Sequence, residues 1–319
     1  MTGTEQDTPH GEAPMRTRAG FVALIGAPNA GKSTLLNQLV GTKVAIVTHK
    51  VQTTRTRITG LALADGQDAD GAWRAQLVFV DTPGIFAPRR RLDRAMVNAA
   101  WSGAFDADET VLVVDAKRGI SQDVETILAG LQQEGRTAIL ALNKVDTIKR
   151  ENLLALTERL HATGLFTDVF MISARTGSGV DDLKAHLAAR MSEGPFLYPE
   201  DQVSAITMRM MAAEITREKV YLRLHEELPY AIAVETEMWE DRKGGDIRIE
   251  QVIHVQRDTQ KKIVIGRGGA MLKQIGQMAR QDMEEAFDTR VHLFLRVRIS
   301  ERWADDRSLY EGMGLEFVD

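Results

Sequence analysis

One stretch near the N-terminus, Gly26 to Ser33, restricts the fold of this chain more than any other feature. Its letters, GAPNAGKS, have the spacing of glycine, four residues, glycine, lysine and serine that is typical of a phosphate-binding loop. An apolar run precedes it over 21–25, and leucines at helical spacing follow it at 35, 36 and 39. A strand, a glycine turn and a helix in this order aim backbone N–H groups and the positive helix end at one point. The stretch therefore predicts an anion site.

Lysine and serine at the end of this stretch have distinct expected roles. Lys32 would reach the β- and γ-phosphates of a nucleotide, and the Ser33 hydroxyl would bind Mg²⁺. A glycine-rich turn without a ligand is the alternative that the motif alone leaves open. The nucleotide-binding candidates of this loop are Gly26, Ala27, Pro28, Asn29, Ala30, Gly31, Lys32, Ser33 and Thr34.

Composition sets wide limits on the rest. The chain has 319 residues, which is enough for two domains with a core each. Its 40 Lys and Arg stand against 45 Asp and Glu, so the overall charge gives no indication of nucleic acid. The absence of Cys excludes disulfides and thiolate metal sites and suits a reducing cytoplasm. No apolar stretch approaches the ~18 residues that a membrane span needs, so a soluble protein is expected, and residues 1–19 are interpreted as a disordered extension.

Strand-like and helix-like segments alternate after the loop. Runs at 57–64 and 74–80, with a polar loop over 65–71, predict an antiparallel hairpin. Alternating strands and helices predict an α/β domain with a mostly parallel sheet and helices on both faces. Ligands then bind beyond the carboxyl ends of the strands, so functional residues should follow them. Further strands are expected at 110–114, 137–142 and 168–172, and helices at 121–133, 150–161 and 180–191.

A second motif, Asp81-Thr82-Pro83-Gly84, comes directly after the strand at 74–80. Asp81 could hold Mg²⁺ through a water, and the Gly84 N–H could meet a γ-phosphate. An ordinary turn is the alternative, because Asp and Gly are common in turns.

A third motif, Asn143-Lys144-Val145-Asp146, follows the strand at 137–142. The Asp146 carboxylate could accept two hydrogen bonds from the N1–H and the 2-amino group of guanine, which adenine cannot supply. Asn143 would tie this loop to the phosphate loop, and the Lys144 stem would cover the base. A solvated polar loop is the alternative for the tetrapeptide taken singly.

A fourth motif, Ser173-Ala174-Arg175, follows the strand at 168–172 and is the least specific of the set. The Ala174 backbone N–H would meet the guanine O6. Four motifs in this order, each at the end of an expected strand, resemble the GTP-binding domain of translation-factor-like GTPases over residues 20–193.

This resemblance implies a switch segment, near residues 41–56, that supplies a threonine to Mg²⁺ and the γ-phosphate. The sequence Gln52-Thr53-Thr54-Arg55 matches the motif of the Era family, and Thr54 is preferred over Thr53. The candidate catalytic residues are Lys32, Thr54 and Gly84, and the candidate metal ligands are Ser33, Thr54 and Asp81.

One position departs from many small GTPases. They carry glutamine just after the Asp-x-x-Gly motif to orient the attacking water, whereas this chain has Ile85. An aliphatic side chain cannot orient water. The resemblance implies a subgroup in which other groups assist hydrolysis, with a monovalent cation near Asn29.

A second domain is expected over 203–319, after a linker at 194–202 that contains two prolines. Its expected elements are a helix at 202–226 and strands at 230–238 and 247–255, joined by a hairpin loop.

A glycine-rich basic stretch follows these strands. Gly-x-x-Gly stands at Gly266 to Gly269, before an expected helix at 270–287 and a strand at 291–299. Nine basic residues stand against five acidic ones between Arg257 and Arg298. Glycines allow a nucleic acid backbone to approach closely, although a purely structural glycine turn is the alternative. The RNA-binding candidates are Lys261, Lys262, Gly266, Arg267, Gly268, Gly269 and Lys273.

The order helix, strand, strand, glycine loop, helix and strand resembles an α+β KH domain of the second topological type. This resemblance implies binding of single-stranded RNA, and a helix at 260–265, where periodicity does not distinguish helix from strand. The pairing of both domains, with Trp303-Ala304-Asp305-Asp306 near the C-terminus, resembles the Era family of bacterial GTPases that act in assembly of the small ribosomal subunit.

Membership of that family would imply GTP and GDP, Mg²⁺ and 16S rRNA near its 3′ end as ligands. It would also imply contact with the small ribosomal subunit and peripheral contact with the inner face of the cell membrane; a cytoplasmic monomer is expected. Two alternatives stay open at this point. One is an RNA-binding scaffold with negligible turnover, and the other is a GTPase that acts on a membrane or protein partner.

Overall fold

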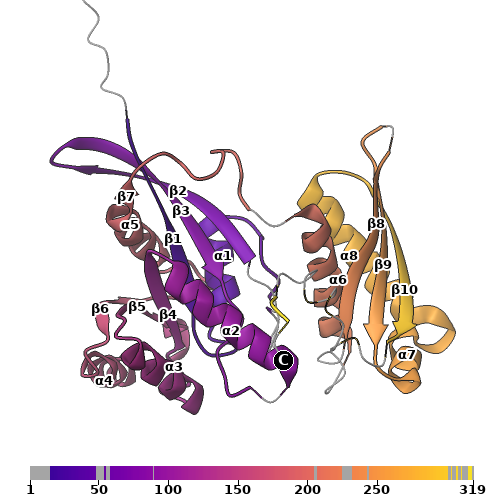
Figure 1. The fold of residues 1–319 in the computed structure, drawn as a ribbon, viewed down its shortest axis with the longest axis horizontal. Helices are drawn as coiled ribbons and strands as arrows, with labels where there is room; N and C mark the ends of the chain where they lie inside the picture. The colour runs from indigo at the N-terminus through magenta and orange to yellow at the C-terminus, as the bar shows by residue number, and fades with distance from the viewer. Residues whose placement is uncertain are drawn as a thin grey trace, which may run out of the picture.

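The protein was analysed as a computed structural model, which describes residues 15–47, 54, 58–88, 90–204, 207–224, 232–242, 244–300, 303, 307, 310 and 315–317. Within these residues the chain forms two domains, drawn side by side in Figure 1. Gln52, Thr53, Arg55 and most of the expected N-terminal extension lie outside the described residues.

The first domain is built on a sheet with the strand order β2-β3-β1-β4-β5-β6. Only β2 within this order runs antiparallel to its neighbour, and the short β7 adds an antiparallel pair to β1. The expected mostly parallel sheet is confirmed. Its strands are β1 (Arg16–Ile25), β2 (Ile58–Asp68), β3 (Gly71–Asp81), β4 (Glu109–Asp115), β5 (Ala138–Asn143), β6 (Phe166–Met171) and β7 (Ser192–Glu193).

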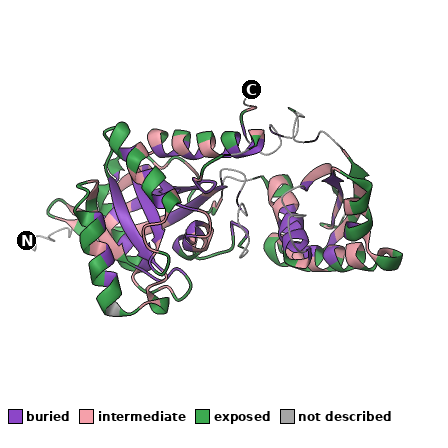
Figure 2. Ribbon diagram, turned by 90° about the horizontal axis from the view of Figure 1, so that it is seen from below, coloured by how far each residue is buried: buried purple, intermediate pink, exposed green. Residues whose placement is uncertain are grey.

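Helices cover both faces of this sheet. Helices α1 (Lys32–Val40) and α5 (Val180–Arg190) pack on one face, together with the side chains of Val22 and Leu24. Helices α2 (Arg91–Asp106), α3 (Gln122–Gln133) and α4 (Arg150–His161) pack on the other. Figure 2 shows the buried residues concentrated in the central strands. Strands that are covered on both faces have continuous apolar sequences, and for this reason their positions could be predicted from the sequence.

The hairpin of β2 and β3 is longer than the sequence predicted. Residues 65–71 were expected to form a polar loop, but the strands pair as far as Asp68 and Gly71 and leave only two residues between them. Cross-strand ion pairs explain the extension, because Arg74 contacts Asp65 at 2.6 Å and Arg18 contacts Asp68 at 2.6 Å. Polar composition alone does not reveal such pairing.

The expected disordered extension through residue 19 is wrong for residues 16–19. Strand β1 begins at Arg16, which pairs with Trp73 on β3. The Arg16 guanidinium also contacts Asp68 at 2.7 Å, so charged residues at the strand start are held by the hairpin.

Helix α2 was not predicted from the sequence, and it contacts the C-terminal part of the chain. Its buried Leu92 and Met96 cluster with Ala233, Trp303 and Tyr310. These apolar contacts join the two domains.

The connection between the domains lies against the first domain. The Gln76 side chain of β3 accepts hydrogen bonds from the backbone N–H groups of Leu197 and Tyr198 and donates to the Tyr198 carbonyl. Further along, the Leu61 N–H donates to the Val203 carbonyl at 2.9 Å. The helix expected from residue 202 is therefore wrong at its start, because α6 (Met208–Arg223) begins only after the Thr207 side chain caps it.

The second domain has the element order expected of a KH domain of the second type. A three-stranded sheet has the order β10-β9-β8, with β10 parallel to β9. Figure 1 shows α6 and α8 on the side that faces the first domain. The expected helix at 260–265 is confirmed as part of α7. The elements after α6 are β8 (Ala233–Asp241), β9 (Ile247–Val255), α7 (Asp258–Ile265), α8 (Ala270–Phe287) and β10 (Val291–Ile299).

The role of Gln76 in holding the connection can be tested by proteolysis. Gln76→Ala removes three hydrogen bonds, each contributing about 1 kcal/mol, so the segment at 196–198 should open more often. We expect chymotrypsin to cleave there roughly ten times faster or more. Gln132→Ala on the exposed side of α3 is the matched control. Equal cleavage rates in the wild type and Gln76→Ala would contradict this assignment.

Candidate nucleotide-binding site

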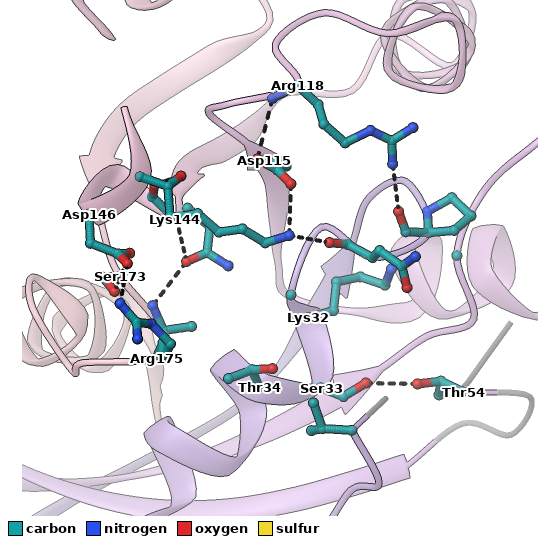
Figure 3. Close-up of a pocket in the computed structure, with 18 of the residues that line it drawn as sticks. Lys32, Ser33, Thr34, Thr54, Asp115, Arg118, Lys144, Asp146, Ser173 and Arg175 are labelled. Carbon is teal, nitrogen blue, oxygen red and sulfur yellow. Dashed lines mark hydrogen bonds and ion pairs between the residues drawn. The ribbon is translucent and has the colours of Figure 1, made fainter. Parts of the chain in front are cut away.

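A cavity of about 560 Å³ opens at the carboxyl ends of the parallel strands. The loops that follow β1, β3, β4, β5 and β6 all line it, as the strand-end rule predicts. Figure 3 shows that its polar side chains come from these separate loops. All four predicted motifs therefore meet at one cavity.

Two glycines of the phosphate loop are required by close approach. Gly26 has φ 154°, and a Cβ there would collide with the Val113 carbonyl oxygen. Gly31 has φ 101°, and a Cβ there would collide with the Asn143 amide. Any side chain at either position would displace the loop, so the motif's spacing reflects packing as well as ligand binding.

Lys32 is buried at the start of α1, with 6% of its surface exposed. Its ammonium donates hydrogen bonds to the carbonyls of Gly26 (3.1 Å) and Ala27 (3.2 Å). Burial lowers the pKa of Lys32 to about 8, although the charge of Asp81 opposes this shift. A phosphate placed here would favour the charged ammonium.

Three oxygen-bearing side chains meet beside Lys32. The Ser33 hydroxyl donates to the Asp81 carboxylate at 2.6 Å and lies 2.7 Å from the Thr54 hydroxyl. Burial raises the pKa of Asp81 to about 6, against the opposing effect of Lys32. The other Asp81 oxygen, Oδ1, is buried without a hydrogen-bond partner. Two hydroxyl oxygens beside a carboxylate with one unpaired buried oxygen fit Mg²⁺.

Thr54, the preferred threonine of the switch segment, lies beside Ser33 and Asp81. Thr54 is buried and its hydroxyl is 3.3 Å from the Asp81 carboxylate. The alternative, Thr53, lies outside the described residues.

The segment after Asp81 contacts the phosphate loop closely. A Cβ on Gly84 would lie 2.9 Å from Pro28 Cγ and 3.0 Å from its backbone nitrogen, so only glycine fits. Thr82 is buried and donates to the Leu24 carbonyl at 2.9 Å, and Pro83 is also buried. The next residue, Ile85, is fully buried in the core and does not line the cavity.

Asn143 joins three of the motifs through its side chain. Its amide nitrogen donates to the Ala30 carbonyl at 2.9 Å. Its amide oxygen accepts from the N–H groups of Lys144 (2.8 Å) and Ala174 (2.9 Å). The predicted tie between this loop and the phosphate loop is present in the structure.

Lys144 spans the cavity from β5 to the phosphate loop (Figure 3). Its ammonium donates to the Asn29 carbonyl at 2.7 Å and to Asp115 at 2.7 Å. Asp115 was not singled out from the sequence. It directly follows the strand expected at 110–114, so the strand-end rule could have found it.

Asp146 lies in another part of the cavity from Ser33 and Thr54 (Figure 3). One carboxylate oxygen accepts from the Ser173 hydroxyl at 2.7 Å, and the other accepts from Arg175 at 2.7 Å. Two hydrogen bonds hold the pKa of Asp146 below its usual range, and the one from Ser173 has a larger effect than the one from Arg175. An ionised carboxylate has more acceptor positions than these two donors occupy. Arg175 belongs to the motif at 173–175, but no role was predicted for its side chain from the sequence. Arg118, which also lines the cavity, was missed because an exposed arginine carries no pattern of its own.

A second candidate site lies on the second domain, at the glycine loop between α7 and α8. Gly266 has φ 74° and a Cβ there would meet the Met271 backbone nitrogen at 2.9 Å. Gly268 and Gly269 also have positive φ, but a Cβ on either would meet nothing within 4 Å. Gly266 therefore shapes the loop, while the other two leave open space above it.

The predicted RNA-binding lysines lie on α7 and α8, the helices on either side of this loop in the sequence, and Arg267 lies within it. Lys262, Arg267, Gly268 and Lys273 are exposed, and Lys261 is half-buried. Lys262 pairs with Asp258 at 2.8 Å on the same helix, so its charge is partly neutralised. Exposed basic residues therefore stand on both sides of the open glycines in the sequence.

The chain was compared with known proteins. A family model described as 50S ribosome-binding GTPase matches residues 21–144, and a model described as KH domain matches residues 227–304. "GTPase Era" of Sinorhizobium medicae is 55% identical over 316 residues, covering 99% of both chains. "GTPase Era" of Caulobacter vibrioides is 54% identical over 316 residues, covering 95% of this chain and 98% of the relative.

Solved structures agree with the fold of both domains. A variant of Aquifex aeolicus Era bound to GDP and AlF₄⁻ is 34% identical, with a TM-score of 0.85, and the match covers 93% of this chain and 99% of that one. Era in complex with MgGDPNP and nucleotides 1506–1542 of 16S ribosomal RNA matches with the same TM-score, 0.85. Within the part of the chain that the structure describes, no helix has the length and apolarity to cross a membrane.

The assignment of Asp146 to the base can be tested by Asp146→Asn. The amide presents one oxygen and one N–H₂ group, so it cannot accept from both donors of guanine. Because hydrogen bonds to a charged group contribute about 1.5–3 kcal/mol each, we expect GDP affinity to fall at least about 100-fold. Affinity for xanthosine diphosphate, whose base offers an acceptor at the 2-position, should rise relative to GDP. Titration with fluorescent nucleotides measures both, with Asp182→Asn on exposed α5 as control. Unchanged GDP affinity would exclude Asp146 as the base contact.

Proposed function

This chain belongs to the Era family of GTPases, and from that premise we propose that it is a GTP-hydrolysing molecular switch that binds 16S rRNA near its 3′ end. In this role it would assist maturation and assembly of the small ribosomal subunit. One arrangement carries the proposal: Lys32, Ser33 and Thr54 line the same cavity as Asp146. The buried Asp81 lies behind Ser33 and Thr54 and accepts hydrogen bonds from both hydroxyls.

Each end of the cavity suits one end of the nucleotide. The phosphate loop offers backbone N–H groups and Lys32 to the phosphates, while Asp146 and the Ala174 N–H suit the donors and the O6 of guanine. Asn143 and Lys144 hold the two ends in register, since both bond to the phosphate loop. Guanine would therefore be selected over adenine by paired carboxylate contacts.

Ser33, Thr54 and Asp81 are proposed to hold Mg²⁺. When bound, the ion would neutralise charge on the β- and γ-phosphate oxygens. Ser33 and Thr54 would supply hydroxyl oxygens, and the Asp81 carboxylate would contact the ion through water. Lys32 would share the phosphate charge, and Gly84, which lies against Pro28, would offer its N–H to the γ-phosphate.

Hydrolysis must proceed without a glutamine beside the Asp-x-x-Gly motif. Ile85 is fully buried and cannot orient the water. We therefore assign assistance to a monovalent cation near Asn29, which has a left-handed backbone (φ 62°) in the phosphate loop. Slow intrinsic turnover follows from this arrangement.

The KH domain is proposed to bind the rRNA. A related Era structure contains nucleotides 1506–1542 of 16S rRNA, and the same fold in this chain presents Lys261, Lys262, Arg267 and Lys273 beside an open glycine loop. A phosphate backbone can approach Gly268 and Gly269 because no side chain occupies that space. We further propose a cytoplasmic monomer that contacts the inner face of the cell membrane peripherally.

The proposal is tested by binding an RNA oligonucleotide that matches the 3′ end of 16S rRNA, with a GTP analogue and with GDP. Gly268→Asp should lower RNA affinity about tenfold or more, because a carboxylate repels the phosphates and fills the approach. Gly244→Asp is a matched control, since this hairpin glycine also has positive φ and open space above it. GTP turnover is measured in parallel. Absence of turnover, or equal RNA affinity for wild type and Gly268→Asp, would refute the corresponding half of the proposal.

Magnesium dependence should change with pH because of Asp81. Burial raises its pKa to about 6, so the carboxylate is ionised above that pH and protonated below it. An ionised ligand is needed for the metal, so the affinity gained from Mg²⁺ should be present at neutral pH and lost as pH falls through about 6. Binding of a GTP analogue with and without Mg²⁺, from about pH 5 to about pH 8, measures this.

Asp81→Asn gives the control for that titration, because it removes the titration of Asp81 and leaves that of Lys32 and of the nucleotide's own phosphates. A Mg²⁺ effect with the same pH profile in wild type and Asp81→Asn would show that Asp81 does not contribute.

A further inference from the structure

A carboxylate of the second domain reaches the nucleotide-binding domain beside the cavity. Glu218 lies on α6 and is 4% exposed. Its Oε1 accepts a hydrogen bond from the Val47 N–H at 3.1 Å, and its Oε2 accepts from Lys43 Nζ at 2.9 Å. Both partners belong to the segment that follows α1 and leads toward Thr54.

The segment at 43–47 is held from two sides. On one side, the Asn37 side chain of α1 accepts from the N–H groups of Val44 (2.9 Å) and Ala45 (2.8 Å) and donates to the Ala45 carbonyl. On the other side, Glu218 binds Val47. Because Ile46 and Val47 line the nucleotide cavity, a residue of the second domain lies one contact away from the nucleotide site.

Glu218 is part of a neutral cluster of four charges. Lys219 lies at 2.9 Å from Glu218, and both Lys43 and Lys219 also contact Asp282 on α8. Burial acts to raise the pKa of Glu218, but hydrogen bonds from Lys43 and Lys219 outweigh it and hold the pKa below its usual value. The carboxylate is therefore ionised and able to form a charge-assisted hydrogen bond with the Val47 N–H at neutral pH.

The ion pairs of this cluster would be enough to attach the two domains to each other. The hydrogen bond to Val47 is different, because it fixes the backbone of a residue that lines the cavity. Six residues lie between Val47 and Thr54 in the sequence, and both line the cavity, where the Thr54 hydroxyl lies beside Ser33 and Asp81. The hydrogen bond from Glu218 therefore fixes one part of a cavity wall that also includes Thr54.

We infer that Glu218 is a positioning residue for the GTP-bound site, acting from the second domain through the backbone of Val47. This inference rests on the proposed function and names how that function is regulated. The expected effect is on the triphosphate, since Thr54 would meet the metal and γ-phosphate, whereas the base and the β-phosphate are held by other loops.

Coupling of this kind is reciprocal. Suppose that GTP binding favours the position of the segment that Glu218 holds. A ligand of the second domain that moves α6 then changes the affinity for GTP, and GTP changes the affinity for that ligand by the same factor. The Glu218–Val47 hydrogen bond would make the nucleotide state and the placement of the KH surface dependent on each other.

Nucleotide binding by Glu218 variants of the full chain tests the inference. Glu218→Ala removes the acceptor, so we expect affinity for a GTP analogue to fall about tenfold relative to GDP, the effect of one charge-assisted hydrogen bond. Glu218→Gln keeps a carbonyl oxygen for Val47 and should retain a larger share of that selectivity. The ratio of RNA affinities with GTP analogue and with GDP should move toward one in Glu218→Ala.

Two controls separate positioning from general stability. Asp282→Asn disturbs the same lysines without touching Val47, so it should keep the wild-type preference for the analogue over GDP. Glu285→Gln makes the same charge change at an exposed site of α8. Thermal unfolding and GDP affinity show that each variant is folded.

The inference would be overturned if Glu218→Ala kept the wild-type preference for the GTP analogue over GDP. It would also be overturned if Asp282→Asn lost that preference fully, because the effect would then belong to the ion cluster. A wild-type chain that neither binds nor hydrolyses GTP would instead refute the proposed function, so the two failures are distinguishable.

Discussion

The site depends on one buried amide, that of Asn143. Its nitrogen and oxygen bond to the backbones of Ala30, Lys144 and Ala174, so a single side chain fixes the phosphate loop, the base loop and the loop after β6. With 1% exposure, none of these bonds competes with water. Loss of the amide would leave three backbone groups unpaired in the interior, which costs far more than a surface hydrogen bond contributes. The distance between the two ends of the nucleotide site is thus set within the protein before a ligand binds.

Burial of opposite charges prepares the other end of the site. Lys32 and Asp81 are both buried, and burial moves the pKa of each toward the neutral form, to about 8 and about 6. The protein keeps these groups in an environment that disfavours their charges, so phosphate and metal would relieve an existing penalty. Perturbed pKa values together in a cavity are a general property of functional sites, and here they coincide with the motifs.

Structural features that follow from local backbone geometry could be predicted from the sequence. Features that depend on contacts between distant residues could not. The order of strands and motifs, the glycine loop of the KH domain, α8 and β10 followed from periodicity and glycine spacing. The start of β1 at Arg16 and the long hairpin could not be predicted, because ion pairs with Asp65 and Asp68 stabilise polar residues that read as a loop. The contacts of Arg118 and Arg175 could not be predicted, because folding alone brings these side chains to the Pro28 carbonyl and to Asp146. Asp115 is different, because its place after a strand made it predictable.

Two segments that line the cavity contact the second domain, but through different chemistry. Phe86, which lines the cavity after the Asp-x-x-Gly motif, packs against the apolar cluster of α2 with Trp303 and Tyr310. Val47, on the other segment, is bound by Glu218. Apolar packing is non-directional and tolerates sliding, whereas a hydrogen bond is lost when its donor turns away. The apolar contact would therefore keep the domains together in every nucleotide state, and the polar contact would report which state is present.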